Sequence, residues 1–429
     1  MNRKKKTLLL FAFLLAFVLG RLSGGVSGAV AQNSDDIFAK LDVFSKVLHY
    51  VETSYVEEVE QEQLVYGAIK GMLDTLDPHT MFMPPDVFKE MKVDTTGEFE
   101  GVGLVIEARE GILAVVNPIE GSPAYDAGVK SGDIVLKIDG KSVDGKSLYD
   151  TVDMMRGPIG TSVVLTISRP STKDPLDFKL VRDRIKVVSV HSKLLDKRTG
   201  YAKIKSFQEQ TTDQFVHELQ KLRVQSGGEL QSLILDLRDN PGGLLEQAVR
   251  LGDEFLSKGL ITSTVGRNGS HVEDEMAHER GSFLNGEMVI LINGYSASAS
   301  EIVAGALQDH RRASLIGGQS FGKGSVQNII ELDDGSGLKL TVAHYYTPNK
   351  RNIDKGGIRP DILVPQPEDM LEMQTASEGA LPDLPADIID DEGMRLLKLD
   401  NKNENVPDDD WQLKVAYAYL SEDGKKRVQ

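Results

Sequence analysis

The spacing of apolar residues predicts helices at the N-terminal end of the chain. Between residues 32 and 92, apolar positions recur at steps of three and four, which is the repeat of an amphipathic helix. The first helix is expected to carry on one face Ile37, Leu41, Phe44, Val47, Leu48 and Val51. A second helix is expected over residues 63–76. The sequence LDPHT at 76–80 ends it before Pro78, because a residue that precedes proline is disfavoured in the α conformation.

A different pattern follows the glycine-rich stretch at 97–111. Short runs rich in β-branched residues and bounded by Gly, Asn and Asp are typical of strands. Their sequences are GLVIEA, ILAVVN, DIVLKIDG and SVVLTISR, and one amphipathic helix, SLYDTVDMMRG, lies between the last two. The pattern predicts a compact, mostly β module that ends near Arg184.

From Tyr201 onward, strands alternate with helices. The run YAKIKSF precedes a helix at 211–225, SLILDLR precedes LLEQAVRLGDEFL, and MVILIN precedes EIVAGALQDH. This alternation predicts an α/β layer with parallel strands. After Pro365 the composition becomes acidic and irregular. A final helix over residues 408–420 is expected to carry on one side Leu413, Val415, Ala416 and Leu420.

The first 31 residues have the organisation of a secretory signal peptide. Residues 3–6 are all basic, residues 8–19 are all apolar, and residues 29–31 form a small-x-small cleavage site. The apolar run is short for a bilayer span, which needs about 20 residues. An uncleaved anchor, or a transient membrane association through this segment, is the alternative. Either way we expect the remaining chain outside the cytoplasm, in the periplasm or another extracytoplasmic space.

Composition narrows the function. The 429-residue chain has a formal net charge of −16, which argues against nucleic acid as a partner, because such binding needs clustered Lys and Arg. The chain has no cysteine, which excludes disulfides, Cys-ligated zinc and a thiol nucleophile. The histidines of HVEDEMAHE at 271–279 do not match the zinc motif His-Glu-x-x-His. We therefore expect neither a metal nor another cofactor.

Ser298 is a candidate nucleophile. It lies between an expected strand and the helix that follows it, where α/β sheets place their sites and where a helix N-terminus favours negative charge. Ser298 and Glu301 also form the pattern of a capping box, and from this stretch alone that structural interpretation is the stronger one. A serine nucleophile needs a base. His310 and His344 stay open as bases, because triad order varies between folds, but neither stands in a recognisable triad context.

Lys323 lies in the stretch GGQSFGKGSVQ, which nearly matches a phosphate-binding loop. Such a loop needs Ser or Thr after the lysine to hold Mg²⁺, and Gly324 stands there instead. In a second interpretation Lys323 is a general base. Its pKa of about 10.4 in water falls when the amine is buried, and a neutral lysine can accept a serine proton. Gln327 can then orient the lysine through its side-chain carbonyl. A solvated loop lysine is the plain alternative.

Two glycine turns are further candidates. The turn RDNPGG at 238–243 can present backbone N–H groups to an oxyanion, although an ordinary β-to-α turn would look the same. The turn GVGL at 101–104 can bind the C-terminal carboxylate of a peptide that pairs with the following strand edge. Leu148, Val152 and Met155 would form the other wall of that peptide site, although they also suit an ordinary core.

Together and in order, these motifs resemble a known family. The series LDPHT, GVGL, GSPAYDAGVKSGDIVLKIDG, MRGPIGTSVVLTISR, LDLRDNPGG, NGYSASASEIVAGALQD and GGQSFGKGSVQ is similar to that of the carboxy-terminal processing (tail-specific) serine proteases. The segment SPAYDAGVKSGD resembles a bacterial-type PDZ domain. The resemblance covers about residues 76–365. Each motif alone is weak, and the ordered set is specific.

The resemblance implies a role for each matching residue. The nucleophile is the middle serine of SASAS, here Ser298, its base is Lys323, and Gln327 supports that lysine. The oxyanion hole is implied to use the backbone amides of Ala299 and of Gly243 in preference to Gly242. The residues implied to bind a peptide tail are Gly101, Val102, Gly103, Leu104, Val152 and Met155.

The implied fold is multidomain α+β, with a ClpP/crotonase-like α/β protease core, an inserted mostly-β PDZ domain and helical N- and C-terminal segments. The expected domains are a signal peptide at 1–31, a helical region at 32–96, the PDZ domain at 97–184, the protease core at 185–372, and an acidic linker with a helical end at 373–429. The implied activity is an endopeptidase that cleaves proteins near C-termini captured by the PDZ domain. The helical ends are implied to form a homodimer, and an activator or adaptor stays unidentified.

One residue departs from the family pattern. Tyr295 stands where a small residue is expected, and we expect it to crowd the nucleophile turn. If it misplaces Ser298, the chain would be a catalytically silent peptide-binding scaffold or chaperone. A P-loop NTPase is the other alternative, and both Gly324 and the export signal argue against it.

Overall fold

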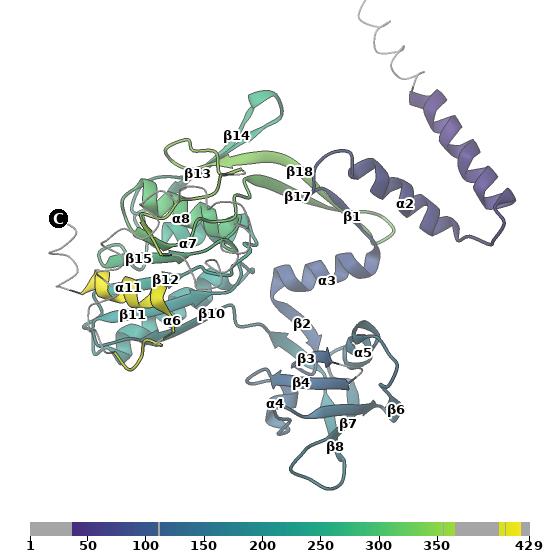
Figure 1. Ribbon diagram of the computed structural model, residues 1–429, viewed down its shortest axis with the longest axis horizontal. Helices are drawn as coiled ribbons and strands as arrows, with labels where there is room; N and C mark the ends of the chain where they lie inside the picture. The colour runs from purple at the N-terminus through teal and green to yellow at the C-terminus, as the bar shows by residue number, and fades with distance from the viewer. Residues whose placement is uncertain (1–36, 110–111, 355, 365–402, 408, 422–429) are drawn as a thin grey trace, which may run out of the picture. The chain divides into compact units, whose positions relative to one another are not determined.

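The computed structural model describes residues 37–109, 112–354, 356–364, 403–407 and 409–421, and Figure 1 labels its elements. The expected signal peptide and most of the expected acidic linker lie outside the described residues. The chain divides into two units, residues 1–84 and 85–429, each with its own contacts. Of the helices in the described ranges, none combines the length and the apolar composition that a membrane span needs.

The first unit is helical, as predicted. Residues 37–54 form one helix, and α2 (Gln61–Leu73) and the short strand β1 (Met81–Met83) follow. Helix α2 ends three residues before the predicted Leu76. After it, the Asp77 carboxylate accepts the backbone N–H groups of His79 and Thr80, at 2.8 and 3.0 Å, and so closes a turn around Pro78. This turn is the local structure of LDPHT.

The second unit begins with α3 (Pro85–Thr96) and continues into the predicted β module. Strand β2 (Glu98–Gly101) enters the module and pairs antiparallel with β9 (Asp183–Lys186), which leaves it. Between them an antiparallel sheet has the order β3-β4-β5-β7-β8, with β6 paired to β5. The bounds are β3 Leu104–Arg109, β4 Ile112–Pro118, α4 Pro123–Asp126, β5 Ile134–Ile138, β6 Lys141–Ser142, α5 Leu148–Met155, β7 Ser162–Ser168 and β8 Leu176–Val181. The four predicted strands and the predicted helix are all present.

The α/β layer is a six-stranded sheet of order β10-β11-β12-β15-β16-β19. Its strands from β11 to β19 are parallel, as the alternation predicted, and β10 pairs antiparallel at the edge. The strand bounds are β10 Val190–Leu194, β11 Thr199–Ile204, β12 Ser232–Asp236, β15 Glu287–Ile292, β16 Ser314–Gly317 and β19 Ile362–Leu363. The helix bounds are α6 Thr211–Gln225, α7 Leu245–Asp253 and α8 Ala299–Asp309.

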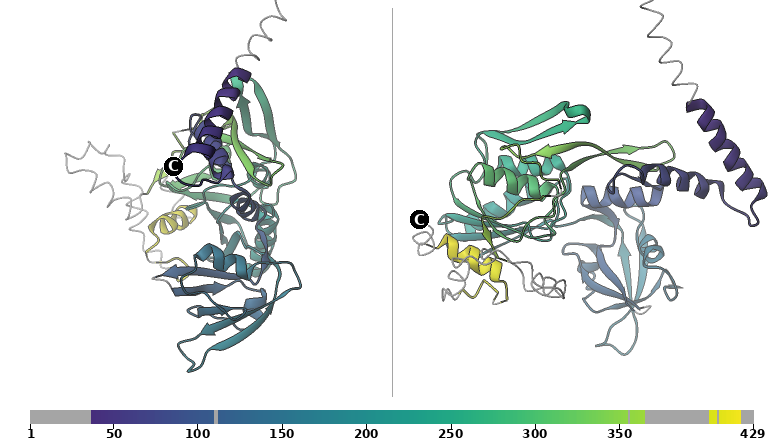
Figure 2. Two further views of the ribbon diagram at one scale, coloured as in Figure 1. Left: turned by 90° about the vertical axis from the view of Figure 1, so that its right-hand side faces the viewer. Right: turned by 45° about the horizontal axis from the view of Figure 1, so that its top comes forward.

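Helices cover both faces of this sheet. Leu233 and Leu235 of β12 pack in one core with residues of α6, α7 and α8, while Ile234 between them packs in a second core with α11 (Trp411–Leu420). This strict alternation along a buried strand places one layer of helices on each side of the sheet. Figure 2 shows α11 in yellow on the side opposite to α7 and α8.

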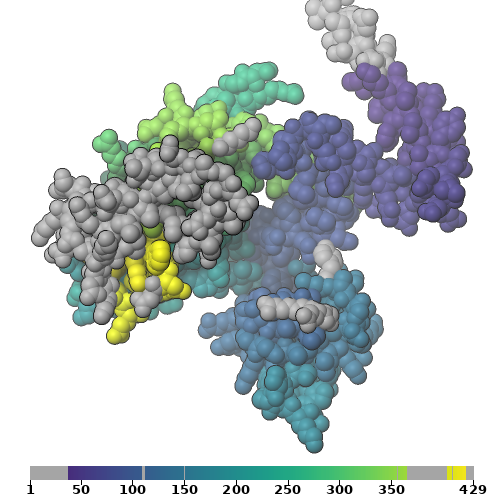
Figure 3. All heavy atoms as spheres, in the orientation of Figure 1, coloured from purple at the N-terminus to yellow at the C-terminus, as the bar shows by residue number. Residues whose placement is uncertain are grey.

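The C-terminal helix α11 is part of the α/β layer. Its predicted apolar side, from Leu413 to Leu420, is buried against the sheet. That side is therefore not available for the dimer contacts that the resemblance implied for this helix. The outer side of α11 forms part of the surface seen in Figure 3.

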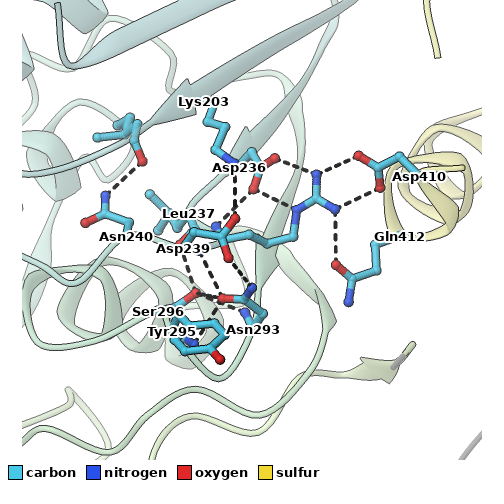
Figure 4. Close-up of polar contacts among 12 residues, drawn as sticks. Lys203, Asp236, Leu237, Asp239, Asn240, Asn293, Tyr295, Ser296, Asp410 and Gln412 are labelled. Atoms are coloured by element: carbon cyan, nitrogen blue, oxygen red, sulfur yellow. Dashed lines mark hydrogen bonds and ion pairs between the residues drawn. The ribbon is translucent and has the colours of Figure 1, made fainter. Parts of the chain in front are cut away.

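A buried ion pair fastens the start of α11. Both terminal nitrogens of Arg238 donate to the Asp410 carboxylate at 2.8 Å, and Arg238 also bonds the buried Asp236. Asp410 in turn accepts the Leu413 backbone N–H at 2.9 Å and caps the helix. Figure 4 shows Asp410 and Gln412 on the α11 side of this network and Asp236 on the other side.

A second group of strands was not anticipated by the alternation. Strands β13 and β14 form an antiparallel hairpin, and β18 pairs antiparallel with both β13 and β17. Their bounds are β13 Gly259–Gly266, β14 His271–Ala277, β17 Ser325–Glu331 and β18 Gly337–Tyr346. Near its end, β18 places Ala343 and Tyr345 inward and His344 outward. These strands bring the candidate base to the candidate nucleophile.

Candidate active site

Ser298 is held in an uncommon backbone conformation at the start of α8. Its φ and ψ are 55° and −112°, in a region that non-glycine residues rarely adopt. The turn is fixed by the carbonyl of Asn240, which accepts the Ala297 N–H and the Ser300 hydroxyl, both at 3.0 Å. Such a turn between a strand and a helix presents a nucleophile beyond the sheet edge. Ser298 is 9% exposed.

Glu301 caps the helix, as predicted, and also holds the lysine loop. Its carboxylate accepts the Ser298 backbone N–H at 2.8 Å, the Ser320 hydroxyl at 2.6 Å, and the N–H groups of Gly322 and Lys323 at 2.7 and 2.9 Å. Burial raises the pKa of Glu301, and these four hydrogen bonds oppose the rise. The capping motif predicted the first of these bonds. The other three join residues about 20 positions away, which no local pattern reveals.

The hydrogen bonds of the Glu301 carboxylate argue against the P-loop alternative. In a phosphate-binding loop, the backbone N–H groups around the lysine point at the phosphates. Here the N–H groups of Gly322 and Lys323 are bonded to Glu301. The near-match at 317–327 therefore cradles a carboxylate of the same chain.

Ser298, Lys323 and Gln327 line one cavity of about 340 Å³. Lys323 lies in the loop between β16 and β17, and Gln327 lies on β17. Tyr345, Lys339, Gly242 and Gly243 line the same cavity. Two larger cavities, of about 530 and 650 Å³, contain none of the predicted site residues. The chemistry that the sequence predicted thus converges on the smaller one.

The cavity lowers the pKa of Lys323. Burial is the main cause, the positive charge of Lys339 acts in the same direction, and the charge of Glu301 opposes both. This is the direction that a general base requires. Within the described residues, Lys323 makes no direct hydrogen bond to the Ser298 hydroxyl, whose partner is Tyr345.

Gln327 has an acceptor without a partner. Its side-chain nitrogen donates to the hydroxyls of Ser325 and Thr341, at 3.1 and 2.8 Å. Its side-chain oxygen is buried and has no hydrogen-bond partner among the described residues. A buried polar atom without a partner is rare in native proteins. This oxygen is a ready acceptor for an N–H group inside the cavity.

The two glycines of the Asn-Pro-Gly-Gly turn differ in their N–H groups. The Gly242 N–H donates to the Asn240 side chain at 2.9 Å, while that of Gly243 has no hydrogen-bond partner in the described part of the chain. Their φ values, 102° and 140°, both favour glycine. A Cβ on Gly242 would lie 2.8 Å from that of Ser298, and a Cβ on Gly243 would lie 2.2 Å from the Phe207 carbonyl oxygen.

The prediction that Tyr295 crowds the turn of the candidate nucleophile is wrong. Its side chain is 68% exposed, and its backbone N–H donates to Asn293 at 3.1 Å. Figure 4 shows Tyr295 beside Asn293 and Ser296, in the loop before α8. Most of the ring surface is in solvent, while Ser298 is buried, so crowding by Tyr295 gives no reason for a silent site.

Tyr345 is the site residue that sequence reasoning missed. Its hydroxyl lies 2.6 Å from Ser298 Oγ, and its ring is 4% exposed. Burial raises its pKa to about 12. The alternation on β18 could have shown that Tyr345 faces inward and His344 outward. Within the described residues no histidine lines the cavity, and His310 instead bonds the Leu260 carbonyl at 2.7 Å.

In the β module, some of the predicted tail-binding residues are buried in the core and others are partly exposed. Gly103, with φ of 77°, packs so closely that an added Cβ would lie 2.2 Å from the Ser122 side chain. Val102 and Met155 are buried in the core of the module, at 3% and 6% exposure. Val152 is half-buried on α5. Val102 and Met155 thus contribute to the core of the module. Binding of a peptide C-terminus by the GVGL turn at 101–104 stays a prediction.

Comparison with known proteins decides the family. The model of peptidase family S41 matches residues 198–364, a PDZ domain model matches 115–169, and the model of the activating protease CtpB N-terminal domain matches 24–87. The carboxy-terminal-processing protease of Bartonella bacilliformis is 45% identical over 336 residues, which cover 78% of this chain and 77% of that protein. The chain belongs to the carboxy-terminal processing proteases of peptidase family S41.

This protease is also similar to other members. The carboxy-terminal processing protease CtpA of Bacillus subtilis is 36% identical over 357 residues, which cover 83% of this chain and 74% of that one. The solved structure of a photosystem II D1 C-terminal processing protease is 29% identical and covers 75% of this chain and 86% of its own, with a TM-score of 0.45. The family-model matches and the Bartonella and Bacillus relatives confirm the family, its serine-type peptidase activity and the PDZ domain that the motifs implied.

Proposed function

We propose that this protease is an exported endopeptidase that cleaves proteins near their C-termini with Ser298 as nucleophile and Lys323 as general base. One observation carries the proposal. Ser298, at the start of α8, lines the same cavity as Lys323 and Gln327, which lie in a separate segment of the chain. Burial in that cavity lowers the pKa of the lysine, and a residue at this place needs a lowered pKa to act as a base.

In the proposed reaction, neutral Lys323 takes the proton from Ser298 Oγ as Oγ attacks the peptide carbonyl carbon. The Gln327 side-chain oxygen accepts one N–H of Lys323 and so turns the nitrogen lone pair toward Ser298. The buried, unpaired state of that oxygen supports this role. Lys323 then gives the proton to the leaving amine, and water hydrolyses the acyl-enzyme with the same base.

The negative carbonyl oxygen would be held by the backbone N–H groups of Ala299 and Gly243. Ala299 is the first residue of α8, where N–H groups lack helical partners and the helix dipole favours negative charge. Gly243 is favoured over Gly242 because the Gly242 N–H is already bonded to Asn240. Two preorganised donors of this kind form an oxyanion hole.

We further propose that the PDZ domain binds the free, apolar C-terminus of a protein substrate. The names of the relatives, which process carboxy termini, and the PDZ match at 115–169 support this. Export rests on the basic, apolar and small-x-small order of residues 1–31. A homodimer and an activating partner are carried only by the resemblance to the family.

The proposal is tested by cleavage of an unfolded protein with an apolar C-terminus, followed by intact-mass spectrometry. The full chain, isolated after export, is compared with Ser298→Ala and Lys323→Ala. We expect fragments from the full chain alone, with both variants folded. Cleavage by Ser298→Ala would show that another residue is the nucleophile. Cleavage by Lys323→Ala would show that another residue is the base. Binding of the tail without cleavage by the unchanged chain would instead favour a peptide-binding scaffold.

A further inference from the structure

Tyr345 contacts both the candidate nucleophile and the loop of the candidate base. Its hydroxyl oxygen lies 2.6 Å from Ser298 Oγ. Its backbone N–H donates to the carbonyl of Gly324, at 2.9 Å, in the residue directly after Lys323. Tyr345 is buried in the main core of the protease domain and also lines the cavity that contains Ser298. One residue of β18 therefore joins the two halves of the site.

The chemistry of the site fixes the direction of this hydrogen bond. Each hydroxyl holds one proton, and either could donate. When Lys323 acts as base, the Ser298 proton must point to the lysine nitrogen, so Ser298 cannot also donate to Tyr345. The phenol is then the donor and Ser298 Oγ the acceptor. Because burial raises the pKa of Tyr345 to about 12, the phenol keeps its proton at working pH. Ser298 Oγ is also its one hydrogen-bond partner among the described residues.

We propose that Tyr345 is a catalytic residue that donates its O–H to Ser298 Oγ during the reaction. The inference rests on the Ser298–Lys323 pair proposed above and adds a third group to it. The bond orients the serine lone pairs before attack. It also stabilises the negative charge that Oγ carries while its proton moves away, and a hydrogen bond to a charged oxygen is stronger than one to a neutral oxygen.

The proposed steps balance with the peptide substrate and one water molecule as the only reactants. The Ser298 proton moves to Lys323 Nζ, the Oγ–C bond forms, and the carbonyl π pair moves to the carbonyl oxygen. The carbonyl then re-forms, the C–N bond breaks, and Lys323 gives its proton to the leaving amine. In deacylation Lys323 takes a proton from the attacking water as the water oxygen bonds to the carbonyl carbon. The Oγ–C bond then breaks, the electron pair returns to Oγ, and Lys323 gives that proton to Oγ. Tyr345 keeps its own proton in both steps. It stabilises Oγ as nucleophile in the first step and as leaving group in the second.

The test is the Tyr345→Phe variant of the full chain, which removes one oxygen from a buried ring. The substrate is the unfolded protein with an apolar C-terminus, labelled with a fluorophore. We expect kcat to fall about tenfold to a hundredfold, with KM unchanged, because the lost bond acts mainly on developing charge. The matched control is Tyr346→Phe, since the Tyr346 hydroxyl has no hydrogen-bond partner among the described residues. A kcat for Tyr345→Phe that equals or exceeds that of the control overturns the proposal, and a higher value would mean that the bond restrains Ser298.

A second variant keeps the ring and the hydroxyl, so it also serves if Tyr345→Phe fails to fold. In Tyr345→3,5-difluorotyrosine the phenol is a stronger acid. We expect wild-type kcat at low pH and a falling limb at higher pH that the wild type lacks, because an ionised phenol cannot donate. A profile that runs parallel to that of the wild type overturns the proposal.

Failure of the catalytic pair and failure of Tyr345 are distinguishable. Active unchanged protein with inactive Ser298→Ala and Lys323→Ala establishes the pair. If the pair is established in this way, full activity of Tyr345→Phe contradicts only the catalytic role of Tyr345. Full activity of Lys323→Ala removes the pair, and with it the fixed direction of the Tyr345 hydrogen bond.

Discussion

Glu301 accepts the backbone N–H of Lys323 with the same carboxylate oxygen that accepts the N–H of Ser298. The turn of the proposed nucleophile and the loop of the proposed base are thus held by one buried atom. The carboxylate also accepts two donors on its other oxygen, from Ser320 and Gly322. An acceptor that serves two loops fixes the distance between them, which is what a catalytic pair on separate segments requires.

The first prediction is that Glu301→Gln damages both stability and activity. An amide presents one NH₂ group where the carboxylate has an oxygen, so two N–H or O–H donors would face a donor. We expect a loss of about 2–4 kcal/mol in the free energy of unfolding and at least a tenfold lower kcat. Denaturant unfolding and steady-state kinetics measure the two effects. The control is Glu246→Gln, an exposed residue in the first turn of α7. Equal stability of the two variants would contradict the role of Glu301.

The second prediction concerns the Gly243 turn. A methyl group at Gly243 would lie 2.2 Å from the Phe207 backbone oxygen, at a φ of 140°. We expect Gly243→Ala to lower the free energy of unfolding by about 3 kcal/mol or more and to reduce kcat strongly, because the backbone N–H must move. Gly121→Ala is the control, since Gly121 also has positive φ, 74°, but no atom within 4 Å of the added methyl. Similar effects of the two changes would show that only backbone strain matters.

Much of the protease core was predictable, for physical reasons that differ between elements. Helix 211–225 was predicted to the residue, and the parallel strands followed from their alternation with helices. The β13, β14, β17 and β18 group was missed as one sheet because its two hairpins are joined by the pairing of β13 with β18, which are far apart in the chain and leave no local periodic mark. The Tyr345–Ser298 contact was missed for the same reason, since 47 positions separate the two residues.

Tyr295 illustrates the opposite error. The sequence showed a large residue beside the nucleophile and predicted crowding. The turn sends that side chain to solvent, where it is 68% exposed. Proximity along the chain does not fix the direction of a side chain, because a tight turn reverses direction within two or three residues.

The third prediction links the C-terminal helix to pH. Burial acts to raise the pKa of Asp410, but the hydrogen bonds and charge of Arg238 outweigh it, and the pKa is lowered. A lowered carboxylate pKa contributes stability above the unfolded value of about 3.9 and loses it as pH falls through the folded value. We therefore expect Asp410→Asn to lower the free energy of unfolding at pH 7 by about 1–3 kcal/mol.

The difference in the free energy of unfolding between the wild type and Asp410→Asn should become smaller as pH falls below about 4, because wild-type Asp410 then becomes protonated. Denaturant unfolding across this pH range measures it. The exposed neighbour Asp409 provides the control, as Asp409→Asn. If this difference in the free energy of unfolding were the same at all pH values, the ion pair with Arg238 would not set the pKa of Asp410.

The fourth prediction uses Lys339, whose positive charge lowers the pKa of Lys323 from across the cavity. Lys339→Met removes that charge, so the pKa of Lys323 should rise. The rising limb of the rate profile should then move to higher pH, while the exposed Lys258→Met control leaves it in place. A shift to lower pH would contradict the assigned sign.

The most direct test of the central claim is the pH dependence of kcat/KM for the full chain. The free-enzyme base controls this profile. With Lys323 as base, we predict one rising limb with a midpoint below the ordinary lysine value of about 10.4, and an upward displacement of that limb in Lys339→Met. A plateau reached through a group that titrates near 6.5, unmoved by Lys339→Met, would contradict a Ser298–Lys323 pair.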